Sequence, residues 1–258
     1  MIYWSPQHRR AFAVLQYGLQ SRAPVTLVSG EIGSGKTTLV QALLGEIEAS
    51  LTIGLISNAQ GGRGELLQWI LNAYGLQSDQ DSNNYIGLFQ RFQDFLLAEY
   101  AADRRVVLIV DEAQNLSAEG LEEVRMLTNI NSHKDELIQL VLVGQPELAD
   151  IVRAPNMRQL AQRVSASFHL GPLDQETCAA YLTHRLKVAG GTGDEISRDA
   201  KDMIYKHTGG VPRLMNQLAD FGMLYGWSDE VKQVGTKEIQ DVLDDGVFFG
   251  DIAIGATS

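Results

Sequence analysis

The stretch that most constrains the fold is LVSGEIGSGKTTLVQALL, residues 27–44, in which three glycines and a lysine separate two apolar segments. Its glycines, lysine and first threonine match the spacing G-x-x-x-x-G-K-[ST], which lies between a β-strand and an α-helix. Glycines let successive backbone N–H groups face one centre, and the following helix adds the positive end of its dipole. The sequence therefore predicts a phosphate-binding loop made of Gly30, Glu31, Ile32, Gly33, Ser34, Gly35, Lys36, Thr37 and Thr38.

Two residues of this loop have distinct expected roles. Lys36 has the length and charge to reach the β- and γ-phosphates of a nucleotide, and the Thr37 hydroxyl is suited to hold Mg²⁺. The alternative is a flexible surface turn, which the strand before and the helix after the loop disfavour. The sequence thus predicts binding of ATP or ADP with Mg²⁺.

A second segment, VVLIVDEAQNL, places Asp111 and Glu112 directly after an apolar strand. Two adjacent acids at such a place are unfavourable unless a cation lies beside them, and Mg²⁺ supplies that charge. We expect Asp111 to hold the metal through its water shell and Glu112 to orient or deprotonate the attacking water. The pattern predicts hydrolysis rather than binding alone; the alternative is a helix cap beside a surface acid.

Three further polar residues are candidates for the same site. Gln145 directly follows the strand IQLVLVG, and in a parallel sheet the ligand lies beyond the carboxyl ends of the strands, so Gln145 is expected near the γ-phosphate or the water. Arg213 lies in the first turn of a helix, where a guanidinium opposes the helix dipole and calls for an anion such as phosphate. For Arg163, the residues alone leave a catalytic role and a surface ion pair open.

The rest of the chain indicates an α/β fold followed by helices. Near-continuous apolar runs alternate with amphipathic segments, which favours a parallel sheet buried on both faces. The segment 165–170 alternates instead and is expected at an edge. The expected strands are 25–29, 51–57, 106–110, 138–144 and 165–170.

Helical periodicity and capping residues predict the helices. The first begins at Ser5-Pro6 and runs to residue 20, and a second, 117–130, begins behind Ser117 with Leu121, Val124 and Leu127 on its buried face. A third, 83–100, carries a stripe expected in the core: Tyr85, Leu88, Phe92, Phe95 and Leu96. Beyond residue 170 only helices are expected, at 174–188, 197–207, 212–227 and 236–244, with starts marked by Asp174, Ser197, Pro212 and Thr236.

These elements predict a domain organisation of 1–170 for the α/β part, 171–246 for the helical part and 247–258 for an acidic, flexible tail. The formal net charge of −11 argues against broad nucleic-acid binding but leaves room for a small basic patch. Cys178 is the single cysteine, no apolar run approaches the ~20 residues of a membrane helix, and the N-terminus is too polar for a secretory signal. The expected compartment is the cytoplasm, with association with the inner membrane only through partners.

Taken in order, seven segments resemble the AAA+ ATPase superfamily and, more narrowly, the ExeA/GspA-like ATPases of bacterial secretion and pilus systems. They span about residues 3–245 and read SPQHRRAFAVLQYGL, GEIGSGKTTL, VVLIVDEAQNL, LEEVRMLTNI, IQLVLVGQPEL, MRQLAQRVSASFHLGPL and GGVPRLMNQL. The resemblance implies a three-layer P-loop NTPase domain with a mainly parallel five-stranded sheet, followed by a small all-helical lid domain.

The resemblance also implies roles for individual residues. Lys36 and Thr37 fall on Walker A, Asp111 and Glu112 on Walker B, Gln145 near sensor 1 and Arg213 on sensor 2. Arg163 falls where such proteins carry an arginine finger that reaches the γ-phosphate of a neighbouring subunit, with Arg158 as the nearby alternative. His8 and Arg9 are expected near the adenine.

The implied partners are copies of the same chain, in a ring or filament, and a protein of a secretion, pilus or exopolysaccharide export system. Full-length secretion members add a membrane span and a periplasmic peptidoglycan-binding region, and neither is recognisable in this sequence. We therefore expect an excised ATPase domain or a stand-alone relative. The alternative is a DNA-binding AAA+ switch, of the kind that selects targets in transposition or acts in replication.

Overall fold

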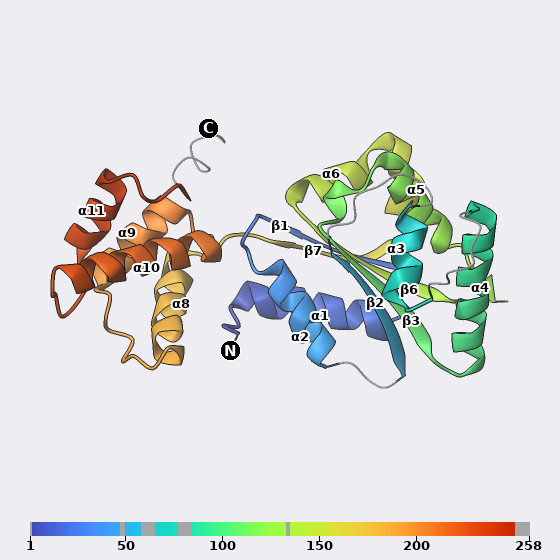
Figure 1. The fold of residues 1–258 in the computed structure, drawn as a ribbon, viewed down its shortest axis with the longest axis horizontal. Coiled ribbons are helices and arrows are strands. Elements are labelled where there is room, and N and C mark those ends of the chain that lie inside the picture. Colours follow the sequence, from blue (N-terminus) through green and yellow to red (C-terminus); the bar gives the residue numbers. More distant parts are fainter. Residues whose placement is uncertain (1, 47–49, 58–64, 77–83, 133–134, 251–258) are drawn as a thin grey trace. The chain divides into compact units, whose positions relative to one another are not determined.

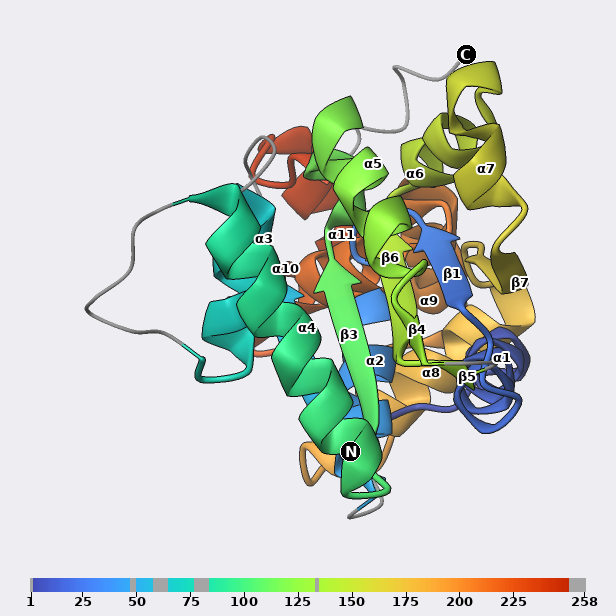
Figure 2. The same ribbon diagram turned by 90° about the vertical axis from the view of Figure 1, so that its right-hand side faces the viewer.

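A computed structural model describes residues 2–46, 50–57, 65–76, 84–132 and 135–250 (Figures 1 and 2). The chain forms two compact units. The α/β unit lies within residues 10–30 and 36–169, and the helical unit comprises residues 2–9, 31–35 and the described residues from 170 onward. The predicted domain bounds stay a prediction. Residues 251–258 of the expected acidic tail lie outside the described residues.

The α/β unit is built on a five-stranded sheet in the order β2-β3-β6-β1-β7. The β2–β3, β3–β6 and β6–β1 pairs are all parallel, as predicted. β7 lies at the end of the sheet, so the expected edge position of residues 165–170 is confirmed. The strands are β1 (Val25–Gly30), β2 (Leu51–Ser57), β3 (Arg105–Asp111), β6 (Ile138–Gly144) and β7 (Val164–Leu170).

Helices cover both faces of this sheet (Figures 1 and 2). On one face Leu108 and Leu140 belong to a core shared with Phe92 and Leu121. On the other face Gln139 donates to the carbonyl oxygens of residues 18 and 19 at the end of α1, at 3.2 and 3.4 Å. Two-sided burial explains the near-continuous apolar strands. The helices described in this unit are α1 (Pro6–Gln20, which begins in the helical unit), α2 (Lys36–Gly45), α3 (Glu65–Ala73), α4 (Tyr85–Ala101), α5 (Ala118–Leu127), α6 (Pro146–Arg153) and α7 (Arg158–Ala161).

Several local predictions for this unit are confirmed. α1 begins at Pro6, and α5 is capped by the Ser117 hydroxyl, which accepts from Gly120 N at 3.1 Å. The stripe of α4 lies in the core, with Phe92 fully buried. α5 ends at Leu127, three residues before the predicted end. The structure adds elements that the sequence does not predict: the helices α3, α6 and α7 and the small antiparallel pair β4 (Asn131–Ser132) and β5 (Asp135–Glu136).

The helical unit contains α8 (Gln175–Val188), α9 (Arg198–Thr208), α10 (Pro212–Ser228) and α11 (Thr236–Asp244). Asp174 and Ser197 cap α8 and α9 through their side chains, as predicted from the sequence. Cys178 is buried in the core of this unit, where burial raises the pKa of its thiol to about 12. No described helix is both long and apolar enough to cross a bilayer.

Candidate functional site

The glycine-rich loop joins β1, which ends at Gly30, to α2, which begins at Lys36. Gly33 and Gly35 have φ angles of +80° and +102°, a region that side chains other than glycine rarely adopt. Space is also lacking, because a Cβ at Gly33 would lie 2.4 Å from Arg213 Cβ and one at Gly35 would lie 2.7 Å from His8 Nε2. Glycine is therefore required at both positions by backbone conformation and by packing.

Lys36 is buried and its ammonium group is turned back onto the start of the loop. Its Nζ donates to the Gly30 carbonyl oxygen at 2.7 Å, and the residue is 5% exposed. Its first-turn neighbours Thr37 and Thr38 are exposed, as are Glu31 and Ile32 in the loop. The Ser34 hydroxyl is buried, and among the described residues it has no hydrogen-bond partner. The loop thus holds a positive charge, the N–H groups of a helix start and a buried hydroxyl, which fit a phosphate.

The acid pair lies at the end of β3, beside the start of α2. The Thr37 hydroxyl donates to Asp111 Oδ2 at 2.9 Å, so two oxygen groups predicted as Mg²⁺ ligands meet across 74 residues of sequence. Asp111 is 5% exposed and accepts from the Glu112 N–H at 2.9 Å. A threonine hydroxyl beside a carboxylate is a donor set that suits Mg²⁺.

Glu112 has an unusual backbone. Its φ and ψ are 55° and 37°, the left-handed region, which is unfavourable for a residue with a Cβ. The two acidic side chains have different partners: that of Asp111 accepts from Thr37, and that of Glu112 lies at the end of β6. There its Oε2 accepts from Gln114 Nε2 at 2.6 Å and from Gln145 Nε2 at 3.3 Å. Strained backbone of this kind concentrates at functional sites.

Gln145 and Glu112 are therefore together, as the topology of the strands predicts. The sequence reading missed Gln114, whose Oε1 accepts from the Gln145 N–H at 2.9 Å while its amide nitrogen bonds Glu112. A signal was present in the sequence, because Gln114 follows the acid pair by two residues, within the turn that leaves β3. A single strand end, however, does not reveal which neighbour its side chain meets.

In the helical unit, His8 and Arg213 lie against residues 31–35 of the loop. His8 Nε2 contacts the Ser34 carbonyl oxygen at 3.0 Å, and its Nδ1 contacts the Ser5 hydroxyl at 2.7 Å. A carbonyl only accepts, so Nε2 carries the proton and Nδ1 accepts from Ser5. Burial lowers the pKa of His8, and the bond to Ser34 opposes that shift. His8 thus supports the loop through its hydrogen bond to Ser34. Its predicted place near adenine stays a prediction, as does that of Arg9, which donates to the Trp4 carbonyl oxygen at 2.6 Å.

Arg213 is the second residue of α10, after Pro212. Its N–H donates to the Gly33 carbonyl oxygen at 3.3 Å, and the stem of its side chain occupies the space beside that glycine. Arg213 itself is exposed. The residue expected at the sensor 2 position is therefore next to the loop, and its role toward a phosphate stays a prediction.

Arg163 lies elsewhere in the α/β unit and is engaged within its own chain. Its guanidinium donates to the Thr128 carbonyl oxygen at 2.8 Å, to Asn129 Oδ1 at 2.5 Å and to Glu136 Oε1 at 3.2 Å. Burial raises the pKa of Glu136, and the Arg163 charge opposes that shift. This is the ion pair that the sequence left open. Arg158, by contrast, is exposed at the start of α7. A finger role for either arginine stays a prediction.

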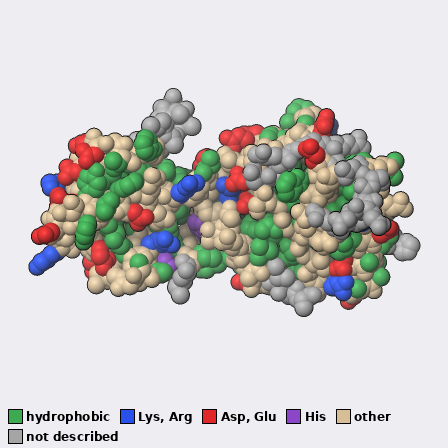
Figure 3. Space-filling model, in the orientation of Figure 1, with side chains coloured by type: hydrophobic (Ala, Val, Ile, Leu, Met, Phe, Trp, Pro, Cys, Tyr) green, Lys and Arg blue, Asp and Glu red, His purple; other side chains and the backbone are tan. Residues whose placement is uncertain are grey.

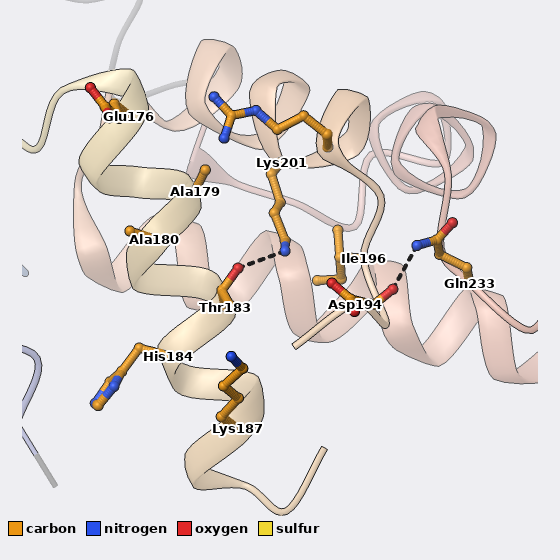
Figure 4. A pocket seen from close by; sticks show the side chains of 11 residues that line it. Glu176, Ala179, Ala180, Thr183, His184, Lys187, Asp194, Ile196, Lys201 and Gln233 are labelled. Atoms are coloured by element: carbon orange, nitrogen blue, oxygen red, sulfur yellow. Dashed lines mark hydrogen bonds between the residues drawn. The ribbon is translucent and has the colours of Figure 1, made fainter. Parts of the chain in front are cut away.

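A separate hollow of about 620 Å³ lies in the helical unit, between α8 and the loop before α9 (Figure 4). None of the predicted site residues lines it. Lys201, 6% exposed, points into this space and donates to Thr183 Oγ1 at 2.8 Å and to the Gly193 carbonyl oxygen at 2.9 Å. Burial lowers the pKa of Lys201. The lysine fixes the loop to α8, which explains its presence without a ligand.

The fold and the loop geometry define a P-loop ATPase domain, and the comparison with known families agrees. The AAA domain family matches residues 19–152, so the chain belongs to that family and is an AAA+ ATPase by class. It is also 40% identical over 223 residues to general secretion pathway protein A of Aeromonas hydrophila, across 86% of this chain. The predicted likeness to ExeA/GspA-like ATPases is confirmed by this match. The chain spans 41% of the length of that relative.

Solved structures of low identity show the same fold. Cdc6p from Pyrobaculum aerophilum superposes with a TM-score of 0.72 at 18% identity, covering 90% of this chain and 65% of that one. ORC2 from Aeropyrum pernix in its ADP form gives 0.65 at 15% identity, covering 94% and 70%. The RuvB Holliday junction branch migration motor of Thermotoga maritima gives 0.58 at 15%, covering 93% and 69%. The predicted fold class, a mainly parallel sheet with a helical part after it, is confirmed.

Proposed function

We propose that this chain hydrolyses ATP with Mg²⁺. The observation that carries the proposal is the contact of Thr37 with Asp111, with Glu112 turned aside from it and held by two amides. Thr37 and Asp111 provide the oxygens that would hold Mg²⁺, which when bound neutralises charge on the phosphates. The separation of Glu112 from this pair leaves its carboxylate for another task.

Each side chain then has one task. The loop N–H groups and Lys36 bind the phosphates, and Glu112 accepts a proton from the attacking water or orients it. Gln145, which shares Glu112 with Gln114, is placed to contact the same water or the γ-phosphate. Because the left-handed turn at Glu112 separates the two acids, one carboxylate serves the metal and the other serves the water.

Two substitutions test this assignment. Lys36→Ala removes a charge-assisted contact and should weaken ATP binding about ten- to a hundredfold. Glu112→Gln should retain ATP binding but lower kcat about 10²- to 10⁴-fold. Binding of a fluorescent ATP analogue and release of phosphate measure the two steps separately. Glu119→Gln, an exposed acid in the first turn of α5, is the matched control. Normal turnover in Glu112→Gln would remove Glu112 from the role of base.

The biological task is proposed from the relative. General secretion pathway protein A suggests that ATP hydrolysis here drives or regulates the assembly of a secretion, pilus or export system through a homo-oligomer and a partner protein of that system. Light scattering with ADP and with a slowly hydrolysed ATP analogue tests for the oligomer. A mass that stays that of one chain in both states would contradict it.

A DNA-dependent switch is the other candidate, and the net charge of −11 disfavours it. Titration with duplex DNA in the presence of ATP, at two salt concentrations, separates the two proposals. Tight binding that weakens steeply with salt would favour the DNA switch. We expect no such binding.

A further inference from the structure

The C-terminal end of α10 exposes a row of apolar side chains. Met223, Leu224, Trp227 and Val231 are 38%, 53%, 79% and 38% exposed, and we name these four residues the α10 stripe. At 100° per residue, the three residues within α10 lie on one face of the helix. Val231 follows the helix but returns to its last turn, where its N–H donates to the Gly226 carbonyl oxygen at 2.9 Å.

The helical unit does not need these side chains for its own core. α10 packs through a different set of positions, Met215, Leu218, Ala219, Gly222 and Gly226, all of which are buried. In the described residues the helix therefore has two apolar faces, one covered and one facing solvent. Exposed tryptophan and leucine on one helix face are typical anchors for a bound helix.

Acidic residues border the stripe. Asp220 lies on the same helix face one turn before Met223, and Asp229 and Glu230 follow the helix directly; all three are exposed. Lys237 forms an ion pair with Asp229 at 3.2 Å and the exposed Lys232 follows Val231, so Asp220 and Glu230 carry the acidic character of this border. Figure 3 shows hydrophobic side chains on the drawn face of the helical unit, with several acidic and a few basic side chains around them. Asp220 and Asp229 are nine residues apart, which is about 14 Å along a helix.

This charge pattern selects among occupants. Two identical stripes packed against each other would bring the same acidic residues, Asp220 and Glu230, close together, and an anionic membrane surface is negative, so the border disfavours both at this face. We propose that the α10 stripe binds an amphipathic helix of another protein, with lysines or arginines near both ends of its apolar face. Four side chains make a small interface, which indicates transient binding.

A synthetic 16-residue peptide tests the proposal, with leucines at positions i, i+3, i+4 and i+7 and lysines on either side. Fluorescence anisotropy of the labelled peptide with the full chain should show binding that weakens at least about tenfold in Trp227→Ala and also weakens in Glu230→Gln. Trp227 is 79% exposed, so its substitution should leave the melting temperature unchanged. The matched control is Ile86→Ala on α4, a residue 70% exposed, which should bind as the wild type does.

The outcomes are distinct. A peptide with glutamates in place of the lysines should not bind. Equal binding of the lysine peptide by wild type and Trp227→Ala would overturn the proposal, because the attraction would then be charge alone. Dimerisation or binding to anionic vesicles that Trp227→Ala abolishes would also overturn it, by assigning the stripe to a second copy or to a membrane.

An independent observation concerns Gln114, and the inference drawn from it rests on the proposed function. We infer that Gln114 is the positioning residue of Glu112. Its amide can take only one orientation, because Glu112 accepts and the Gln145 N–H donates. Gly144 at the end of β6 makes the room: a Cβ there would lie 2.6 Å from Gln114 Oε1 and 2.8 Å from Leu148 Cδ2.

Gln114→Met keeps the size of the side chain and removes both hydrogen bonds. It should lower kcat about ten- to a hundredfold while the Kd for ATP and KM stay near those of the wild type. Gly144→Ala should lower kcat similarly, and adding it to Gln114→Met should cause little further loss, because both act on one contact. A Gln114→Met enzyme with wild-type kcat would overturn the inference. If Glu112→Gln also has wild-type kcat, the proposed function fails; if only Gln114→Met does, the inference alone fails.

Discussion

At the scale of single residues, the loop is specified by positions that tolerate one residue type. Gly33 combines a positive φ with a side chain of Arg213 pressed against its Cα. Gly87, on the surface of α4, has neither restriction: nothing lies within 4 Å of a Cβ built there. The two glycines therefore predict opposite effects of the same substitution.

Gly33→Ala should destabilise the protein by at least about 1–2 kcal/mol, because a Cβ is disfavoured in the left-handed region and also clashes. It should weaken ATP binding as well. Gly87→Ala should instead stabilise by about 0.5–1 kcal/mol, since alanine orders more easily within a helix. Denaturant unfolding and ATP binding measure both variants. Equal stability of the two would contradict the argument from backbone conformation.

At the scale of elements, one carboxylate makes several hydrogen bonds within the loop before α9. Glu195 accepts from the N–H groups of Thr192 and Gly193 and from the Thr192 hydroxyl. These hydrogen bonds lower the pKa of Glu195 from its usual 4.5 to about 2, and the bond from the Thr192 N–H has the largest effect. A carboxyl whose pKa is lower in the folded state stabilises the fold above the unfolded pKa.

The stabilisation from Glu195 should thus be complete above about pH 4.5 and lost as the pH falls toward about 2. Glu195→Gln should lower the melting temperature at neutral pH and flatten its decline between pH 5 and about 2. Glu176→Gln, an exposed acid in the first turn of α8, is the control and should keep the wild-type decline. Melting curves across this range provide the measurement, and parallel declines in wild type and Glu195→Gln would contradict the assignment.

At the scale of the whole molecule, the two arginines predicted as finger candidates differ in their contacts within the chain. Arg163 forms hydrogen bonds or ion pairs with Thr128, Asn129 and Glu136, so its side chain contributes to the stability of the fold. Arg158 is exposed, and among the described contacts its side chain has no comparable stabilising interaction. A residue that reaches a neighbouring subunit should affect turnover only in the assembled protein.

Arg163→Ala should therefore destabilise the chain by about 1–2 kcal/mol, whereas Arg158→Ala should leave the melting temperature unchanged. The alanine variant of the arginine that acts as the finger should retain ATP binding and lose ATP turnover. Mixing that variant with Lys36→Ala should restore part of the activity, because each mutant supplies what the other lacks. Failure of rescue at every mixing ratio, for both arginines, would argue against a finger acting between subunits.

The sequence by itself determined the elements whose signals are local. Strand and helix periodicity, the caps at Ser117, Asp174 and Ser197, and the glycine spacing all act within a few residues, so the fold class and the loop could be predicted. The topology of a parallel sheet then brought Thr37 to Asp111 and Gln145 to Glu112. Glu112 and Gln145 follow the neighbouring strands β3 and β6, whereas Thr37 follows β1, which β6 separates from β3; all of them lie at the carboxyl ends of the strands.

Only the tertiary structure decided which side chains meet where no periodicity applies. It placed Gln114 between Glu112 and Gln145, gave Glu112 its left-handed turn and set His8 beneath Ser34. It also showed which apolar face of α10 is covered and which is exposed. The physical reason is that the periodicity of a helix shows which of its faces are apolar, whereas the burial of each face depends on neighbouring elements that are distant in the sequence.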